Sequence, residues 1–205
     1  LRLDLLDARL SGNKPLKLAG WLDVFRQSGR RRLLSFGGVH SNHLHALAVL
    51  ASVERIPLTL VVRGYESAAL TPTLQDCLTL GADLQFVDRI TYARRYDVCW
   101  QQELATLQDA LVIPEGGGGE PGLAGCRLLA PTAAAYDDVW LAVGSGTTAM
   151  GIAQGLAALG SRTRLVGVNA VADQGERLRH WQRDMPASCD WTLIETAELG
   201  GFARC

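Results

Sequence analysis

Short apolar runs alternate along the chain with longer segments in which apolar residues recur at every third or fourth position. The short runs predict strands, and the recurring pattern predicts helices with one buried face. A first helix is expected to begin at residue 14, where Asn13 can cap it and Pro15 suits its first turn. The other expected helices cover residues 41–54, 71–81, 94–107, 121–135, 147–159 and 173–183, and the expected strands cover 32–37, 57–64, 82–88, 110–116, 137–144, 162–171 and 189–195.

Strands that alternate with helices of this length indicate βαβ units, and therefore parallel sheets. The apolar residues in the strand runs are nearly continuous, which is typical of strands that helices cover on both faces. No internal repeat and no low-complexity linker interrupts the pattern. We therefore predict an α/β protein.

The composition is that of an ordinary soluble protein: 48% of the 205 residues are hydrophobic, 20% are charged, and the net charge is −1. This balance argues against a surface for nucleic acid or for an anionic membrane. No apolar stretch approaches the roughly 18 residues that span a bilayer, and no secretion signal is visible. The five cysteines include no C-x-x-C pair, so we expect a reducing cytoplasm, no disulfide framework and no metal site.

The segment VGSGTTAMG, residues 143–151, places a loop of small residues between a predicted strand and a predicted helix. Such a loop presents backbone N–H groups and the positive end of a helix dipole, which together bind phosphate. The hydroxyl groups of Ser145, Thr147 and Thr148 can donate further hydrogen bonds, and the two glycines let a phosphate approach the backbone. We favour an anion site over a plain turn.

Two kinds of phosphate are consistent with this loop. The spacing Gly144-x-Gly146-x-x-Ala149 satisfies a loose dinucleotide fingerprint, which would make the chain a dinucleotide-dependent oxidoreductase. That fingerprint expects an acidic residue roughly 20 positions later, where the sequence has Asn169. The G-x-x-x-x-G-K-[ST] pattern of an NTPase and the G-x-S-x-G pattern of a hydrolase are both absent. A phosphate carried by something other than a nucleotide is therefore the stronger hypothesis.

The segment GGVHSNHLH, residues 37–45, is a second loop that follows a predicted strand and opens a helix. Its two leading glycines permit close approach and unusual backbone angles. Ser41, Asn42 and His43 place several polar groups at the helix start, where one N-cap would be enough. We therefore favour a binding loop over a simple cap.

Lys14 lies at the predicted start of the first helix, where the positive helix end disfavours a positive charge. That field favours the neutral form of the amine, which is the form that imine formation needs. Lys17 lacks this placement, and we expect it to be a solvated helix residue. Taken alone, Lys14 would be an ordinary surface lysine, so its interpretation depends on the two loops.

Residues 114–122, PEGGGGEPG, contain four consecutive glycines flanked by acidic residues and prolines. A flexible connection and a ligand-facing loop both fit this composition. The sequence favours neither.

The three stretches together resemble the fold type II (tryptophan synthase β-like) pyridoxal-phosphate enzymes, in the branch of 1-aminocyclopropane-1-carboxylate deaminase and D-cysteine desulfhydrase. SGNKPLKL is similar to that family's G-G-N-K-x-x-K-L lysine motif. GGVHSNH is similar to its G-G-[IV]-Q-S-N-[QH] motif, and VGSGTTAMG to its phosphate loop. The three occur in the family's order, and the resemblance runs through the whole chain.

The resemblance implies pyridoxal 5'-phosphate as the cofactor, held by Lys14 as an internal aldimine. Lys14 would also move the substrate proton, and Ser41 would be the catalytic serine beside the substrate. Asn42 would bond the ring oxygen of the cofactor, and His43 would lie where the substrate carboxylate is held, so that the three residues from Ser41 to His43 bind the substrate. The phosphate would be held by the backbone amides of Gly144, Ser145, Gly146, Thr147 and Thr148.

The resemblance also implies the reaction, the partners and the domains. We expect a lyase or hydrolase that deaminates a small amino acid by β-elimination or ring opening, releasing ammonia and a 2-keto acid. A homodimer is expected, with the active site in a cleft between a large domain, residues 1–30 and 113–205, and a small domain, residues 31–112. A non-catalytic ligand-binding relative is the alternative.

The sequence departs from the family pattern in three places. His40 replaces a glutamine, and Leu44-His45 replace a stretch in which closer members carry arginine, so the substrate can differ from both named amino acids. The chain ends at residue 205, where the family continues. We therefore expect the large domain to be incomplete and the partner of the pyridine nitrogen to lie beyond residue 205.

Overall fold

The computed structural model describes residue 3 and residues 9–10, 12–66, 70–170 and 176–195. The chain forms two compact units, residues 1–121 and residues 122–205. Every strand pair within the described ranges is parallel, which confirms the predicted α/β class. No helix in the described part of the chain is long and apolar enough to cross a membrane.

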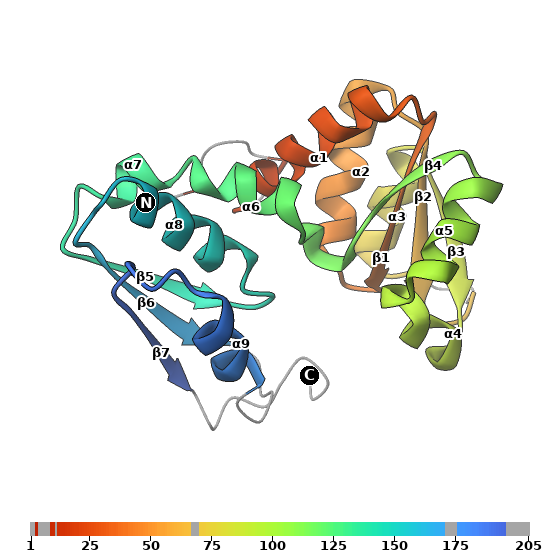
Figure 1. Ribbon diagram of the computed structural model, residues 1–205. Coiled ribbons are helices and arrows are strands. Elements are labelled where there is room, and N and C mark those ends of the chain that lie inside the picture. The colour runs from red at the N-terminus through yellow and green to blue at the C-terminus, as the bar shows by residue number, and fades with distance from the viewer. Residues whose placement is uncertain (1–2, 4–8, 11, 67–69, 171–175, 196–205) are drawn as a thin grey trace. The chain divides into compact units, whose positions relative to one another are not determined.

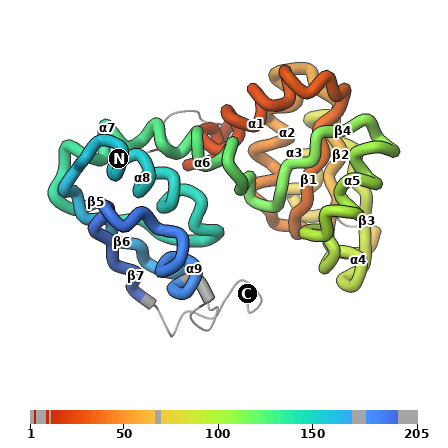
Figure 2. The backbone as a smooth tube through the Cα atoms, viewed as in Figure 1, coloured from red at the N-terminus to blue at the C-terminus, as the bar shows by residue number. Residues whose placement is uncertain are grey.

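The first unit contains the strands β1 (Arg32–Gly38), β2 (Leu58–Arg63), β3 (Ala82–Val87) and β4 (Ala110–Ile113). They form one sheet in the order β3-β2-β1-β4 (Figures 1 and 2). In its register, Ser35 of β1 lies opposite Leu60 of β2 and Ile113 of β4. The strands β1 and β2 are buried almost throughout, as parallel strands between helices should be.

Helices cover both faces of this sheet (Figure 1). Leu18, Leu44 and Leu74 belong to the core on one face, and Tyr92 and Trp100 belong to the core on the other. The first face carries α1 (Lys14–Ser28), α2 (Asn42–Glu54) and α3 (Pro72–Thr79), and the second carries α4 (Arg89–Ala93) and α5 (Val98–Leu107). The short 3-10 turns η2 (Arg94–Tyr96) and η3 (Glu115–Gly117) also belong to this unit.

The strand order reverses between β1 and β4. The chain passes from β1 outward to β2 and β3, and then returns to the other side of β1 to form β4. In open parallel sheets, ligands bind at the carboxyl ends of the strands where the order reverses. The segments that leave the sheet at this point are residues 39–41, after β1, and residues 114–119, after β4. The fold thus places two of the segments noted in the sequence at one edge of the sheet.

The second unit contains β5 (Asp138–Val143), β6 (Arg164–Asn169) and β7 (Trp191–Glu195), in that order in the sheet. Both α8 (Thr147–Ala158) and α9 (Glu176–Asp184) pack on one face, where Trp181 is fully buried. On the other face Trp140 is 60% exposed and Ile194 is 38% exposed. The helices α6 (Glu120–Arg127) and α7 (Ala130–Ala133) precede the sheet in the chain.

The helix expected over residues 94–107 is interrupted. Asp97 accepts hydrogen bonds from the backbone N–H groups of Cys99 (2.9 Å) and Trp100 (3.3 Å), so a new helix, α5, begins at Val98. Residues 94–96 form η2 instead, and α4 before them was not predicted. An N-cap aspartate inside a helical pattern is the signal that was overlooked.

The helix expected over residues 121–135 is also divided, into α6 and α7. Pro131 lies in the first turn of α7. A proline cannot continue a preceding helix, because it lacks the N–H group and its ring clashes with the backbone one turn earlier. The remaining expected elements are present, with ends that differ by at most three residues, and the expected positions 171 and 173–175 lie outside the described residues.

Residues 14–28 pack within the first unit, where Leu18 and Trp21 belong to the same core as Leu44. The predicted large domain, which joins residues 1–30 to residues 113–205, stays a prediction, as does the small domain of residues 31–112.

Candidate active site

The loop between β1 and α2 carries three of the predicted site residues. Ser41 is the N-cap of α2, and its hydroxyl oxygen accepts a hydrogen bond from the backbone N–H of Leu44 at 3.3 Å. Gly37 is required sterically, because a Cβ there would lie 2.5 Å from Leu44 Cγ and 2.8 Å from Ser41 Oγ. Ser41 is half-buried and Asn42 is exposed, so both can meet a ligand at the positive end of the α2 dipole.

The His43 side chain turns into the core. It is 4% exposed, and its Nε2 lies 2.8 Å from Ser35 Oγ. Ser35 donates its one hydroxyl hydrogen to the carbonyl oxygen of Ile113 at 2.8 Å, so it accepts from His43, and Nε2 carries the hydrogen. Nδ1 is then a bare acceptor, buried and without a hydrogen-bond partner among the described residues. Burial, followed by the charges of Lys14 and Lys17, lowers the pKa of His43 to about 3.

This placement restricts the predicted role of His43. A neutral imidazole that is buried against Ser35 cannot form an ion pair with a substrate carboxylate. The backbone N–H of His43 lies in the first turn of α2, where N–H groups lack intrahelical acceptors. The contact with a carboxylate stays a prediction, and we now assign it to this N–H group.

Lys14 is the first residue of α1, as predicted. Asn13, in the N-cap position, has helical backbone angles (φ −82°, ψ 0°), and its side chain does not cap the helix. Its Oδ1 instead accepts a hydrogen bond from Lys14 Nζ at 3.0 Å. The predicted cap is therefore wrong, and Asn13 orients the Lys14 amine.

Lys17 is buried, so the expectation of a solvated residue was wrong. It is 4% exposed, and its Nζ donates to the carbonyl oxygen of Gly116 at 3.4 Å. The two residues lie 99 positions apart, so no local pattern could have indicated this contact. The chain contains only two lysines, Lys14 and Lys17. The half-buried Lys14 is the more accessible of the two amines.

The four consecutive glycines, residues 116–119 and called the glycine run below, are fixed by their neighbours. Trp21 Nε1 donates to the carbonyl oxygen of Gly118 at 3.0 Å, in addition to the bond between Lys17 and Gly116. The φ angles of Gly116 (+77°) and Gly117 (+69°) are in the left-handed region that favours glycine. These contacts favour a held segment over a flexible connection, and the ligand-facing interpretation of the run stays a prediction.

The loop after β5 has the geometry of an anion site. Gly146 is the N-cap of α8 with a φ of +84°, no side chain caps the helix there, and its first turn has no acidic residue. A Cβ on Gly144 would meet no atom within 4 Å, so the backbone is open to approach. The hydroxyl groups of Ser145 and Thr147 lie 3.2 Å apart. Backbone N–H groups and hydroxyls thus gather at the positive end of a 12-residue helix.

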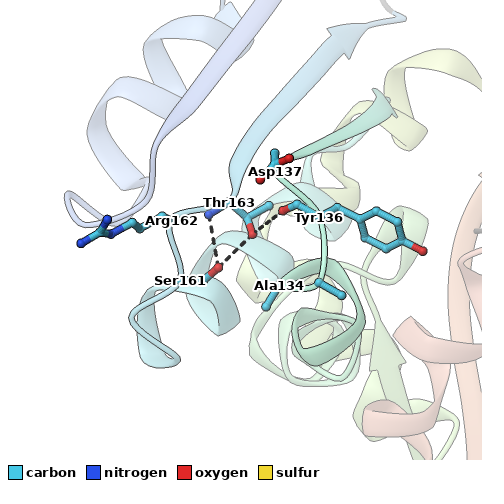
Figure 3. A pocket seen from close by; sticks show the side chains of 7 residues that line it. Ala134, Tyr136, Asp137, Ser161, Arg162 and Thr163 are labelled. Carbon is cyan, nitrogen blue, oxygen red and sulfur yellow. Dashed lines mark hydrogen bonds between the residues drawn. The ribbon is translucent and has the colours of Figure 1, made fainter.

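A small pocket of about 170 Å³ lies at the opposite end of the β5–β6 pair (Figure 3). It is lined by residues 134–137 and 161–163, which precede the two strands. Thr163 Oγ1 donates to the carbonyl oxygen of Tyr136 at 2.8 Å and lies 2.9 Å from Ser161 Oγ. These bonds join two turns at the amino ends of parallel strands, whereas ligands bind at the carboxyl ends. Over the described residues, no group of three or more His, Cys, Asp or Glu side chains could hold a metal ion.

Comparison with known proteins identifies the family. A family model described as "Pyridoxal-phosphate dependent enzyme" matches residues 9–197. The chain belongs to this family. Pyridoxal phosphate is therefore the cofactor, as the sequence predicted. Membership also favours this cofactor over the dinucleotide that Gly144-x-Gly146-x-x-Ala149 left open.

Two curated relatives of this chain carry the name "Putative 1-aminocyclopropane-1-carboxylate deaminase". The protein of Thermotoga maritima is 30% identical over 184 residues, which cover 85% of this chain and 59% of the relative. The protein of Pyrococcus horikoshii is 28% identical over 206 residues, which cover 98% of this chain and 61% of the relative. The chain thus spans about three fifths of the length of these relatives.

Solved structures agree on the fold. An "ACC deaminase homologue" matches with a TM-score of 0.77 at 22% identity, covering 99% of this chain and 67% of that one. Maize serine racemase matches with a TM-score of 0.68 at 13% identity, covering 91% of this chain and 64% of that one. These likenesses confirm the parallel α/β architecture of the pyridoxal-phosphate enzymes.

The residues present fit the cofactor. The loop at 144–148 offers backbone N–H groups, hydroxyls and a helix N-terminus without a side-chain cap, which suit a phosphate dianion. Lys14 offers an amine that Asn13 orients, which suits an aldehyde. Reasoning from the sequence missed Ser35, which fixes His43, and Glu115, which adjoins the glycine run. A serine at the centre of an apolar strand was the available signal for Ser35.

Proposed function

We propose that this protein is a pyridoxal-phosphate-dependent lyase or deaminase acting on a small amino acid, of the 1-aminocyclopropane-1-carboxylate deaminase or D-cysteine desulfhydrase type. The products are ammonia and a 2-keto acid. The family and the names of two curated relatives support the reaction type. The substrate, a homodimeric state and a cytoplasmic location belong to the proposal, as does activity, because the chain spans about three fifths of those relatives.

The observation that carries the proposal is the setting of Lys14. Lys17, the other lysine, is buried against Gly116, so Lys14 is the amine that an aldehyde can reach. The N-terminal end of α1 favours the neutral, nucleophilic form of this amine. Asn13 Oδ1 accepts one of its hydrogens and so sets its direction. We assign to Lys14 the attachment of the cofactor and the movement of the substrate proton at Nζ.

When bound, pyridoxal phosphate supplies an electron sink for a carbanion next to the substrate nitrogen. The residues at the start of α2 orient the substrate. Ser41 Oγ accepts a hydrogen bond from the Leu44 N–H, which leaves its hydroxyl hydrogen to donate to the substrate. The exposed Asn42 amide binds the ring oxygen, and the His43 N–H binds the substrate carboxylate.

Residues 144–148 hold the phosphate. Gly146 begins α8 in a left-handed conformation, and the open backbone at Gly144 lets phosphate oxygens come close to the N–H groups. The helix dipole favours a dianion at this end. Ser145, Thr147 and Thr148 supply hydroxyl groups for the remaining oxygens.

The test begins with the absorption spectrum of the purified protein with pyridoxal phosphate added, before and after reduction with borohydride. Peptide mapping of the reduced protein then locates the cofactor. Lys14→Arg and Lys17→Arg are a matched pair, because they are the only lysines and both changes keep the positive charge. We expect a visible band that Lys14→Arg abolishes and Lys17→Arg retains.

Attachment at any residue other than Lys14, or no band at all, would overturn the assignment.

The wild-type protein is then given 1-aminocyclopropane-1-carboxylate, D-cysteine and other small amino acids, and ammonia and keto acid are measured. Cofactor fixed on Lys14 without release of either product would reject the lyase and favour a non-catalytic relative. Stabilisation by NAD(P) without any band would favour the dinucleotide hypothesis.

A further inference from the structure

We propose that Glu115 is a positioning residue. Through the glycine run it fixes the rotation of α1 about its axis, and this rotation sets the direction in which the Lys14 side chain leaves the helix. The significance of this direction rests on the function proposed for Lys14. The contacts that carry the inference all lie within the first unit. They run from α4 and η2, through Glu115 and the glycine run, to α1.

The Glu115 carboxylate gathers three donors. Its Oε1 accepts a hydrogen bond from the Tyr92 hydroxyl at 2.8 Å, and its Oε2 accepts one from the Tyr96 hydroxyl at 3.1 Å and a short one from Arg95 Nε. Hydrogen bonds to an ionised group are about twice as strong as neutral ones. Glu115 is thus held from both of its oxygens by a segment that lies about 20 positions earlier in the chain.

The donors are themselves fixed. The Arg95 guanidinium lies over the rings of Tyr92 and Tyr96, at 4.9 Å and 4.3 Å from their centroids. Tyr92 is 2% exposed, and burial, followed by the charge of Glu115, raises the pKa of its hydroxyl. Tyr92 therefore stays protonated and continues to donate to Glu115. The cluster is a rigid anchor for the residue that precedes the glycine run.

The chain that leaves this anchor supplies acceptors to α1. Directly after Glu115, the carbonyl oxygen of Gly116 accepts from Lys17 Nζ, and that of Gly118 accepts from Trp21 Nε1. Between them, Gly117 adjoins His43, since a Cβ on it would lie 3.5 Å from His43 Cε1. A displacement of Glu115 therefore displaces both carbonyl oxygens on which α1 is held.

Two donor side chains one helical turn apart, each bonded to a fixed acceptor, set the rotation of a helix about its axis. Lys17 and Trp21 are four residues apart and so lie on one face of α1. Lys14 lies three residues before Lys17 and belongs to the same stripe. Fixing Lys17 and Trp21 therefore fixes the direction in which Lys14 leaves the helix.

The first measurement uses the protein without cofactor. Amine acetylation followed by mass spectrometry reports how accessible Lys17 and Lys14 are. We expect Lys17 to be protected in the wild type and to react about tenfold faster in Glu115→Ala, the scale set by losing a charge-assisted hydrogen-bond cluster. Glu115→Gln keeps an acceptor oxygen and should retain most of the protection.

Glu54→Ala is the matched control. Like Glu115, Glu54 has a side chain that is 32% exposed, and it pairs with an arginine, Arg26 of α1, but among the described residues its hydrogen bond goes to Arg26 and not to the glycine run. It should leave the labelling of Lys17 unchanged. Tyr96→Phe removes a single bond to Glu115 from an exposed residue, so it tests the cluster even if Glu115→Ala fails to fold. Tyr96→Phe should raise the rate of Lys17 acetylation, as Glu115→Ala does, but by a smaller factor.

The second measurement traps pyridoxal phosphate on Lys14 with borohydride. We expect the trapping rate to fall about tenfold in Glu115→Ala while Glu54→Ala matches the wild type. Unchanged Lys17 labelling in both Glu115→Ala and Tyr96→Phe would overturn the inference. Failure of the wild type to trap the cofactor would instead reject the proposed function, and the labelling result would still decide whether Glu115 positions α1.

Discussion

The imidazole of His43 donates to the hydroxyl oxygen of Ser35, with Nε2 and Oγ 2.8 Å apart in the core of the first unit. Because the Ser35 hydroxyl donates its own hydrogen bond to the Ile113 carbonyl, the hydrogen bonds run in one direction, from α2 through β1 to β4. This series of hydrogen bonds connects the loop that carries Ser41 to β4, the strand that leads into the glycine run. The buried pair of His43 and Ser35 therefore fixes the loop after β1, residues 39–41, relative to the segment after β4, residues 114–119.

The buried imidazole should make stability depend on pH. The pKa of His43 is lowered from 6.5 to about 3 in the folded protein, so between these values the unfolded chain binds a proton that the folded chain does not. The free energy of unfolding should therefore fall as the pH drops below 6.5, by up to about 1.4 kcal/mol per pH unit from this group. Urea unfolding of the wild type and of His43→Gln from pH 4 to 8 checks this. The two slopes should differ, and equal slopes would contradict the assignment.

Removal of the Ser35 hydroxyl should be costly. Ser35→Ala leaves the buried Nε2–H of His43 without an acceptor and takes a donor from Ile113, so we expect a loss of about 1–3 kcal/mol in the free energy of unfolding. Ser28→Ala is the control, because its hydroxyl also donates to a carbonyl but is exposed. That change should stay within about 0.5 kcal/mol of the wild type. Equal losses in the free energy of unfolding for Ser35→Ala and Ser28→Ala would show that the buried hydroxyl contributes no more to stability than the exposed one.

The fold could be predicted from the sequence because its signals are local. Apolar runs such as that of residues 58–63 admit little other than a buried strand, and their alternation with helices requires parallel pairing. The errors occurred where a polar residue or a proline divides a helical pattern. Asp97 caps α5, and Pro131 lies in the first turn of α7, so the two expected helices became four elements, η2, α5, α6 and α7.

The site was predictable only in part, because its remaining interactions are long-range. Ser41 as a cap and Lys14 as a first helical residue follow from neighbours in the chain. Burial of Lys17 depends on Gly116, 99 positions away, and the tautomer of His43 depends on Ser35 and on β4. Such contacts are set by which strands lie side by side, which hydrophobic periodicity does not specify.

Replacement of Gly146, which is left-handed at the N-cap of α8, should weaken cofactor binding in addition to lowering stability. Gly146→Ala places a side chain at a φ of +84°, and Gly160→Ala does so at +61° just after the same helix. Each should lower the free energy of unfolding by about 1–2 kcal/mol. Only Gly146→Ala should weaken the binding of pyridoxal phosphate, measured by equilibrium dialysis, by about tenfold, since it crowds the N–H groups that receive the phosphate. Equal affinity in the two variants would remove the loop from the site.

Two opposite substitutions in α1 should both destabilise the protein. In a helix, alanine is more stable than glycine by about 1 kcal/mol, so Ala19→Gly at an exposed position should lower the free energy of unfolding by that amount. At the next residue, Gly20→Ala should lower it as well, because the new Cβ would lie 2.2 Å from the carbonyl oxygen of Pro121. Relief of this contact must move α1, so trapping of cofactor on Lys14 should fall in Gly20→Ala and not in Ala19→Gly. A more stable Gly20→Ala protein would mean that α1 does not lie against Pro121 in solution.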